Sequence, residues 1–416
     1  MANPIHAGVP VVPIAPLLWR RVAALWLLSI MLVGCGGDTA LEHQIYIWQR
    51  QWRPAHREAL HQSSALLSGL RVLAHQLHEQ TGWVTAQVDL QLLAQDGRPV
   101  IVVIRLDGAI GVLDAPRILA QLQSTIAHWQ AAGVALTGVE IDYDCGTAML
   151  PHYAEALRQW RAEIPTTLSL SITALPAWLD SVALDAVLAA VDHSVLQVHA
   201  VQHPDAGLFA PAQAWRWTER WAARTAPPFY LALPAYGVAV IADGGDNKSG
   251  GAVVESEVPL AIAGLRREVS ADPHDVAQLL SVLQVNKPAS LRGVIWFRLP
   301  LAHDRRAWPW PTLQAVISQQ RLQARLQVRG QASVTSTDLV LHNIGNAPAI
   351  LPERIELAAT GCDAGDAVAG YRYHYETGRV VFIRHRALPT LPAGQQRALG
   401  WLNCKNLNKD VFDVQL

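Results

Sequence analysis

Between Ile45 and Ile317 the chain alternates apolar runs of strand length with longer stretches of helical character. This alternation is typical of α/β proteins, in which a helix follows each strand and returns the chain to a parallel sheet. We expect strands at Gln44–Gln49, Leu70–Gln76, Trp83–Leu90, Val100–Leu106, Gly138–Asp144, Thr167–Thr173, Val195–His199, Phe229–Pro234 and Gly293–Arg298. Of these, Trp83–Leu90 is the segment expected to leave the main sheet.

The number of strands and the length of this region favour an eight-stranded (β/α) barrel of the TIM type over residues 44–320. The alternative is a doubly wound open sheet. Such sheets commonly carry a glycine-rich phosphate loop after the first strand, and this sequence has none there. The barrel is therefore the predicted fold.

The pattern changes after a helical run that we expect to end near Arg325. Short polar-apolar alternations separated by turn residues indicate a small C-terminal β-sandwich-like domain over residues 321–416. They lie at Asp338–His342, Arg354–Ala358, Tyr371–Tyr375 and Arg379–Ile383. Such a domain either binds glycans or packs on the barrel, and packing is favoured because few aromatic residues could form a platform.

The N-terminal segment carries a targeting pattern. Arg20 and Arg21 precede an apolar stretch, Val22–Val33, that is too short to span a membrane and leads into Gly34-Cys35. This resembles a bacterial lipoprotein signal, with residues 1–34 as the signal peptide, Cys35 as the lipidated residue and residues 35–43 as a tether. The resemblance implies a lipid-anchored protein of the cell envelope, on the periplasmic side or at the outer membrane. An ordinary signal peptide or a buried apolar segment is the alternative.

Composition limits the partners. The 416 residues are 51% hydrophobic and carry a formal charge of −1, which allows a large core and argues against nucleic-acid binding. We expect no cofactor and no metal, because no His, Cys or carboxylate spacing is typical of a metal site; His75 and His78 are expected on a helix. In an oxidising compartment Cys362 and Cys404 could form a disulfide, with Cys145 left alone.

Candidate chemistry lies in the segment Thr137–Cys145. Its three carboxylates, Glu140, Asp142 and Asp144, occupy alternate positions, so in a strand they would share one face. Crowded like charges raise the pKa of at least one carboxyl group, and a protonated acid beside ionised neighbours is what general acid catalysis by glycosidases requires. A solvated strand end is the alternative interpretation.

Three ordered segments carry a resemblance to a known family. Residues 137–144 fall on the Asp-Gly-x-Asp-x-Asp-x-Glu pattern that ends the fourth strand of glycoside hydrolase family 18, the chitinase-like barrels. Leu231–Gly237 resembles the Pro-x-Tyr-Gly segment of the seventh strand, and Gly293–Phe297 resembles the eighth, whose Trp forms the floor of the sugar pocket. The resemblance implies a barrel that cleaves or binds carbohydrate.

The resemblance also suggests roles. Asp144 would be the general acid, its pKa raised by burial and by Asp142 and Glu140, one of which would orient it or stabilise an oxocarbenium-like transition state. Asp144 stands where the family has Glu, and Leu196–His199 replaces the sixth-strand Tyr that holds the acetamido group of the substrate. A second carboxylate would then act as nucleophile or base.

Further residues are candidates for substrate contacts. Trp296 and Tyr236 are expected to form the sugar platform, and Trp48 is either a further platform residue or part of the core. Hydrogen bonds to hydroxyl groups or to a substrate acid are assigned to Gln197, His199 and Arg298. Glu255 and Glu257 belong either to a lid or to a solvated loop.

The sequence resembles one bacterial group more closely still, the domain of unknown function 3142. The motifs are Gly138–Asp144, Leu170–Trp178, Val254–Glu257 and Trp296–Pro300. This group implies a barrel but no established reaction. Two functions follow as hypotheses: an envelope-anchored glycoside hydrolase, or a catalytically inactive barrel that binds glycan or scaffolds an envelope assembly.

Overall fold

The computed structural model describes residues 40–199, 207–242, 252–254, 265–376, 378–407 and 412–414, together with Met1 and Gly8. The rest of the predicted signal peptide lies outside the described residues, as do Cys35, Glu255 and Glu257. A chain division falls after Ala40, and the residues from Leu41 onward form one unit. Within the described residues, no helix is long and apolar enough to cross a membrane.

Eight parallel strands of the described chain close into a barrel. The hydrogen-bonded order is β1-β2-β4-β5-β6-β7-β8-β12, and β12 pairs with β1 to complete the ring. The strands are β1 (Glu42–Ile47), β2 (Gly69–His78), β4 (Val100–Leu106), β5 (Leu136–Tyr143), β6 (Ser169–Ala174), β7 (His193–Gln197), β8 (Phe229–Pro234) and β12 (Leu291–Phe297). The predicted (β/α) barrel is confirmed.

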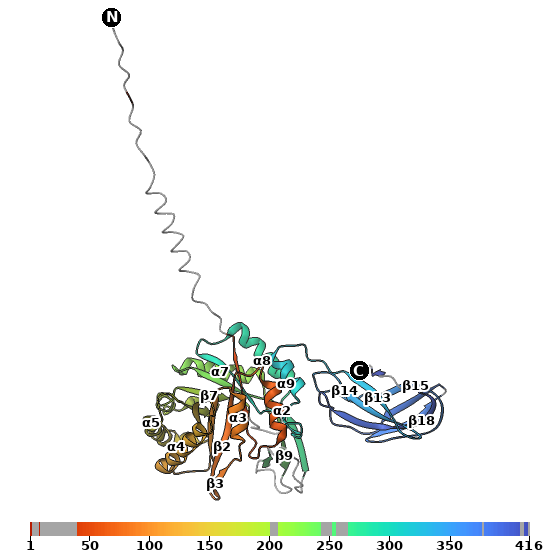
Figure 1. Ribbon diagram of the computed structural model, residues 1–416, viewed down its shortest axis with the longest axis horizontal. Helices are drawn as coiled ribbons and strands as arrows, with labels where there is room; N and C mark the ends of the chain where they lie inside the picture. The colour runs from red at the N-terminus through yellow and green to blue at the C-terminus, as the bar shows by residue number, and fades with distance from the viewer. Residues whose placement is uncertain are drawn as a thin grey trace. The chain divides into compact units, whose positions relative to one another are not determined.

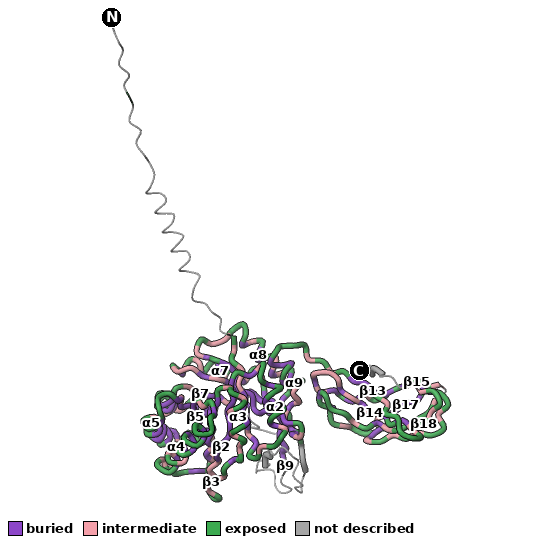
Figure 2. Tube along the Cα trace, viewed as in Figure 1, coloured by how far each residue is buried: buried purple, intermediate pink, exposed green. Residues whose placement is uncertain are grey.

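Helices follow the strands and surround the barrel (Figure 1). They are α2 (Pro54–Ser63), α3 (Leu90–Asp96), α4 (Ala115–Ala131), α5 (Leu150–Glu163), α6 (Leu184–Leu188), α7 (Pro211–Arg224), α8 (Pro273–Asn286) and α9 (Trp310–Ile317), with 3-10 turns at Thr147–Met149 and Pro176–Asp180. Helix α4 illustrates the local cause: the Asp114 side chain accepts a hydrogen bond from the Arg117 backbone and caps its first turn. Its apolar residues at helical spacing, such as Ile118 and Leu122, are buried. Figure 2 shows buried and exposed stretches alternating along α4.

Two excursions leave the ring. Strand β3 (Gly82–Thr85) lies outside the ring, as expected for this segment, and pairs antiparallel with β2. Leu90 begins α3 rather than ending a strand. Strands β9 (Gly237–Ala242), β10 (Ala252–Val254) and β11 (Leu265–Ser270) form a separate antiparallel sheet between β8 and α8. The expectation of a helix at His75 and His78 is wrong, because both residues belong to β2, where His75 lies opposite Ile104 of β4.

The C-terminal region is an antiparallel sheet with its own apolar core, in the described residues. Its strands are β13 (Leu326–Ala332), β14 (Thr337–Asn343), β15 (Arg354–Ala367), β16 (Tyr371–Glu376), β17 (Arg379–Arg384), β18 (Gln396–Leu407) and β19 (Phe412–Val414). The first five residues of β15 pair with β17 and the remainder with β18, so residues of both halves share one core, a sandwich-like arrangement.

The preceding helix is shorter than expected. Helix α9 ends at Ile317 rather than near Arg325, because Gln319 adopts a left-handed backbone conformation with φ of 51°. Farther along, Cys362 of β15 and Cys404 of β18 lie opposite each other and form a disulfide. Cys145 is a buried free thiol.

Candidate active site

A pocket of about 310 Å³ opens at the carboxyl ends of the barrel strands. TIM-type barrels place their functional residues at this end, because the strand-to-helix loops there are free to vary. Side chains from seven of the eight barrel strands, or from residues up to two positions after them, line the pocket together with Leu208 and with Val238 of β9. The lining residues are Tyr46, Trp48, Arg105, Asp142, Asp144, Thr173, Leu175, Gln197, His199, Leu208, Ala232, Tyr236, Val238 and Phe297.

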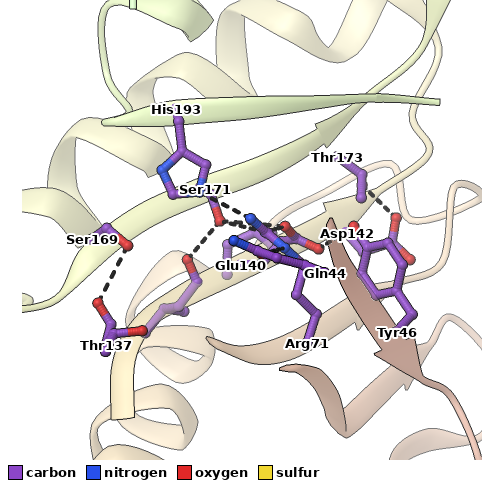
Figure 3. Close-up of polar contacts among 12 residues, drawn as sticks. Gln44, Tyr46, Arg71, Thr137, Glu140, Asp142, Ser169, Ser171, Thr173 and His193 are labelled. Carbon is purple, nitrogen blue, oxygen red and sulfur yellow. Dashed lines mark hydrogen bonds and ion pairs between the residues drawn. The ribbon is translucent and has the colours of Figure 1, made fainter. Parts of the chain in front are cut away.

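Two carboxylates at the end of β5 face this pocket. Asp142 is almost fully buried, with 1% of its side chain exposed, and accepts a hydrogen bond from Thr173 Oγ1 (Figure 3). It accepts a second hydrogen bond from Arg105 Nη1. Asp144 is more accessible, with 29% of its side chain exposed, and its Oδ2 accepts a hydrogen bond of 3.1 Å from Arg105 Nη2. Asp142 is thus a fixed carboxylate, and Asp144 is the one that a ligand can reach.

Arg105 changes the expected charge balance. The sequence analysis expected crowded like charges at these positions, and the forked guanidinium of Arg105 binds both Asp142 and Asp144. Because Arg presents its donors in a rigid plane, one side chain can set the separation and orientation of two carboxylates. The mutual repulsion of the two aspartates is offset by this shared positive charge.

The third carboxylate has a different role from the one expected. Glu140 lies below the pocket, is fully buried, and does not line it. Its Oε1 accepts a 2.6 Å hydrogen bond from Tyr46, and its Oε2 forms an ion pair with Arg71 and accepts from Ser171 (Figure 3). Burial raises the pKa of Glu140, and the charge of Arg71 opposes that rise. Glu140 is therefore a buried ion-pair partner in the barrel interior, and its side chain is separate from the pocket lining.

Arg71 is the centre of this buried layer. Its guanidinium donates to Gln44 Oε1 at 3.1 Å and lies 3.2 Å from His193 Nε2 (Figure 3). It also lies over the ring of Tyr230, 5.3 Å from the centroid. Burial lowers the pKa of His193 to about 3, so its ring is neutral beside the Arg71 cation. One side chain of β2 thereby contacts residues from β1, β5, β6, β7 and β8.

Aromatic side chains form one wall of the pocket. Phe297 lies at the centre, with its ring centroid 5.2 Å from that of Trp48, 5.9 Å from that of Tyr46 and 5.0 Å from that of Tyr236. The platform expected at Trp296 is wrong by one residue. Trp296 is fully buried outside the pocket, where it stacks on His43 and donates to His43 Nδ1, because adjacent strand residues point to opposite faces.

The polar candidates divide in the same way. Gln197 and His199, at the end of β7, line the pocket. Burial lowers the pKa of His199 to about 4, so its imidazole is neutral at neutral pH. Arg298 does not line the pocket; it is buried and forms an ion pair of 2.8 Å with Asp304. The assignment of Arg298 to substrate binding is therefore wrong, because its charge is already bound within the protein.

Four pocket-lining side chains escaped the sequence analysis: Tyr46, Arg105, Thr173 and Phe297. Arg105, Thr173 and Phe297 lie near the carboxyl ends of predicted strands, and this position is the signal that could have identified them. Gly108 adds a constraint on the backbone. A Cβ atom at this glycine would lie 2.4 Å from the carbonyl oxygen of Asp144, so a side chain there would displace the carboxylate-bearing segment.

No group of three or more metal-binding side chains lies together within the described residues. The polar lining of the pocket consists of carboxylate, guanidinium, hydroxyl, amide and imidazole groups. This set can exchange protons and bind hydroxyl or amino groups of a ligand.

Family models match two parts of the chain. Residues 96–302 match the family described as domain of unknown function (DUF3142). This barrel belongs to the DUF3142 family. Residues 326–405, in the C-terminal sheet, match a second family, domain of unknown function (DUF8456). No protein of curated function matches the sequence.

The DUF3142 protein is also similar to solved barrels. The spore cortex-lytic enzyme SleL of Bacillus cereus is 14% identical, with a TM-score of 0.49 over 69% of this chain and 76% of SleL. A chitinase from Chromobacterium violaceum ATCC 12472 is 14% identical, with a TM-score of 0.46 over 68% of this chain and 100% of the chitinase. A class V chitinase from Nicotiana tobaccum is 14% identical, with a TM-score of 0.44 over 67% of this chain and 98% of the chitinase. Likeness of this degree concerns the fold alone.

Proposed function

We propose that the DUF3142 barrel is a glycoside hydrolase that acts on a polysaccharide or oligosaccharide. The observation that carries this proposal is the pair Asp142 and Asp144, which face a pocket at the carboxyl end of the barrel beside an aromatic wall. Paired carboxylates supply proton transfer and charge stabilisation, and aromatic faces suit the flat apolar surface of a sugar ring.

In the proposed reaction Asp144, the more exposed carboxyl group, donates a proton to the glycosidic oxygen as the bond to the anomeric carbon breaks. Asp142, held by Thr173 and Arg105, stabilises the positive charge that develops on the sugar. Water then adds to the anomeric carbon, and its proton returns to a carboxylate. Whether the configuration is retained or inverted depends on the carboxyl group that acts on the second face.

A second function is favoured by one observation. The ion pair between Arg105 and Asp144 occupies the carboxylate that would serve as the acid, and Asp144 is one methylene shorter than Glu. A displacement of about 1 Å can lower a rate on the order of a hundredfold. The alternative is therefore a barrel that binds glycan in this pocket without cleaving it.

The experiment that separates these functions measures reducing ends released from a panel of polysaccharides and peptidoglycan by the full-length protein in detergent. Asp144→Asn is tested beside it, with Glu155→Gln on the exposed face of α5 as the matched control. Glycosidase activity predicts release that persists in the control and is lost in Asp144→Asn. Glycan binding without release by any of the three proteins would favour the binding protein.

We further propose that Cys35 carries a lipid that anchors the protein in the cell envelope, with a carbohydrate ligand on the aqueous side. The support is the sequence pattern around Cys35, and β1 begins seven residues later at Glu42. Membrane fractionation after metabolic labelling with a radioactive fatty acid tests this. The label and the membrane association should both be absent from Cys35→Ala, and a labelled Cys35→Ala protein would refute the anchor.

A further inference from the structure

The pocket combines features that select among sugar types. We infer that the sugar unit bound there carries a free amino group, as in a hexosamine without its acetyl group. This inference rests on the proposed carbohydrate site. The inference draws on the aromatic wall, on the arrangement of charges, and on a buried imidazole nitrogen.

The aromatic wall has the composition of a cation site. Tyr46, Trp48, Tyr236 and Phe297 present adjoining rings at steep angles, with neighbouring centroids 5.0–5.9 Å apart. The π faces of aromatic rings attract ammonium groups, and a pocket lined by several rings can hold such a group. One ring of this wall already lies beside a cation: the guanidinium carbon of Arg105 lies 5.9 Å from the centroid of Trp48.

The charged groups argue against an acidic sugar. Among the described residues that line the pocket, the positive charge is carried by Arg105, which is bound to both Asp142 and Asp144. The imidazole of His199 is neutral at neutral pH. A uronic acid would therefore bring a further negative charge against two carboxylates, whereas an ammonium group would be attracted by them.

His199 adds a hydrogen-bonding group. It is 9% exposed, it lines the pocket, and its Nε2 atom has no hydrogen-bond partner among the described residues. A buried polar atom without a partner is costly, and a ligand that supplies one recovers that free energy. In one tautomer of the neutral ring, Nε2 accepts a hydrogen bond, which an ammonium group can donate.

The size of the pocket sets what must be recognised. A volume of about 310 Å³ is at the lower end of the roughly 300–1,000 Å³ range of small-molecule sites. The pocket therefore has room to recognise a single sugar unit. Monosaccharides are suitable probes, and the binding test does not require the linkage of the polymer to be known.

The test measures binding of glucosamine, N-acetylglucosamine, glucose and glucuronic acid to the full-length protein in detergent, by ligand-observed NMR at neutral pH. We expect glucosamine to bind roughly tenfold more tightly than glucose and N-acetylglucosamine, from cation–π and charge attraction. Glucuronic acid should bind most weakly. Added salt should weaken glucosamine binding more than glucose binding.

Variants assign the effect to the pocket. Phe297→Leu should reduce the preference for glucosamine over glucose several-fold, whereas Glu155→Gln on α5 should retain it. Equal or tighter binding of glucose, N-acetylglucosamine or glucuronic acid would overturn the inference, as would the absence of binding by all four. If the protein released reducing ends from a neutral polymer and from no polymer with free amino groups, the amino-sugar inference would be overturned while the proposed hydrolase would stand. Glucosamine binding without release from any polymer would retain it and reject the hydrolase.

Discussion

Arg105 Nη2 donates a 3.1 Å hydrogen bond to Asp144 Oδ2, while the other terminal nitrogen of the same guanidinium binds Asp142. This side chain comes from β4 and the carboxylates from β5 and the residue that follows it, so strand pairing places them together. The position of the proposed acid is thus determined by a residue that donates no proton to the substrate.

Replacing Arg105 tests this positioning role. In Arg105→Lys the single ammonium group cannot bind both carboxylates through a planar fork, so we expect kcat to fall on the order of a hundredfold with a smaller change in KM. In Arg105→Gln the loss should be at least as large. Steady-state kinetics on the substrate identified by reducing-end release provides the measurement. Unchanged kcat in both variants would show that the fork does not position the acid.

The buried pair Arg71–Glu140 should contribute to stability. Removing one partner leaves the other charge buried and uncompensated, which costs about 3–5 kcal/mol. We expect losses of that size in the free energy of unfolding for Arg71→Met and for Glu140→Gln, measured by urea denaturation. The double variant should lose less than the sum of the single variants, because no buried charge remains. Strict additivity would contradict direct coupling between the two residues.

Trp296 and Phe297 are neighbours with opposite expected effects. Phe297→Leu removes a ring from the pocket wall and should weaken sugar binding roughly fivefold. Trp296→Phe removes the hydrogen bond to His43 and part of a buried ring, both outside the pocket, so sugar binding should be unchanged while the melting temperature falls. Titration calorimetry and thermal unfolding of both variants separate the two effects. Weaker binding in Trp296→Phe alone would restore the original assignment of the platform to Trp296.

The sequence predicted the strands better than the side chains that face the pocket. Val100–Leu106 and Phe229–Pro234 match β4 and β8 residue for residue, because a buried parallel strand is a continuous apolar run. A shift of one residue in a strand exchanges its two faces, and a continuous apolar run contains no alternation to fix this choice. That is why Trp296 was chosen and Phe297 missed.

Long-range partners were the second limit. Asp142 and Asp144 were located by their local spacing, but the ion pair that separates Glu140 from them depends on Arg71, 69 residues earlier. Local patterns identify charged residues, whereas their partners are fixed only when the barrel closes.

The buried histidine of the pocket predicts a dependence of stability on pH. Burial lowers the pKa of His199 to about 4, below its ordinary value of 6.5. Between these two pH values the unfolded chain binds a proton at His199 that the folded chain does not. The contribution of the neutral His199 to the free energy of unfolding is therefore complete above pH 6.5 and is lost as the pH falls toward 4. Near pH 5, the slope of unfolding free energy against pH should be smaller in His199→Gln by about 1 kcal/mol per pH unit. Equal slopes in the two proteins would exclude a neutral buried His199.

The disulfide should stabilise the C-terminal sheet without affecting the pocket. Cys362 and Cys404 are 42 residues apart in the sequence, and their bond joins β15 to β18. Closing a loop of this length restricts the unfolded chain and stabilises the folded sheet by about 2–4 kcal/mol. The double variant Cys362→Ser/Cys404→Ser should therefore unfold its C-terminal sheet at lower urea concentration, and dithiothreitol should reproduce this shift in the natural protein but not in the variant. Sugar binding should be equal in both proteins, because the pocket is lined by barrel residues and by β9. A further shift on reduction of the double variant would mean that the stabilising bond involves another cysteine.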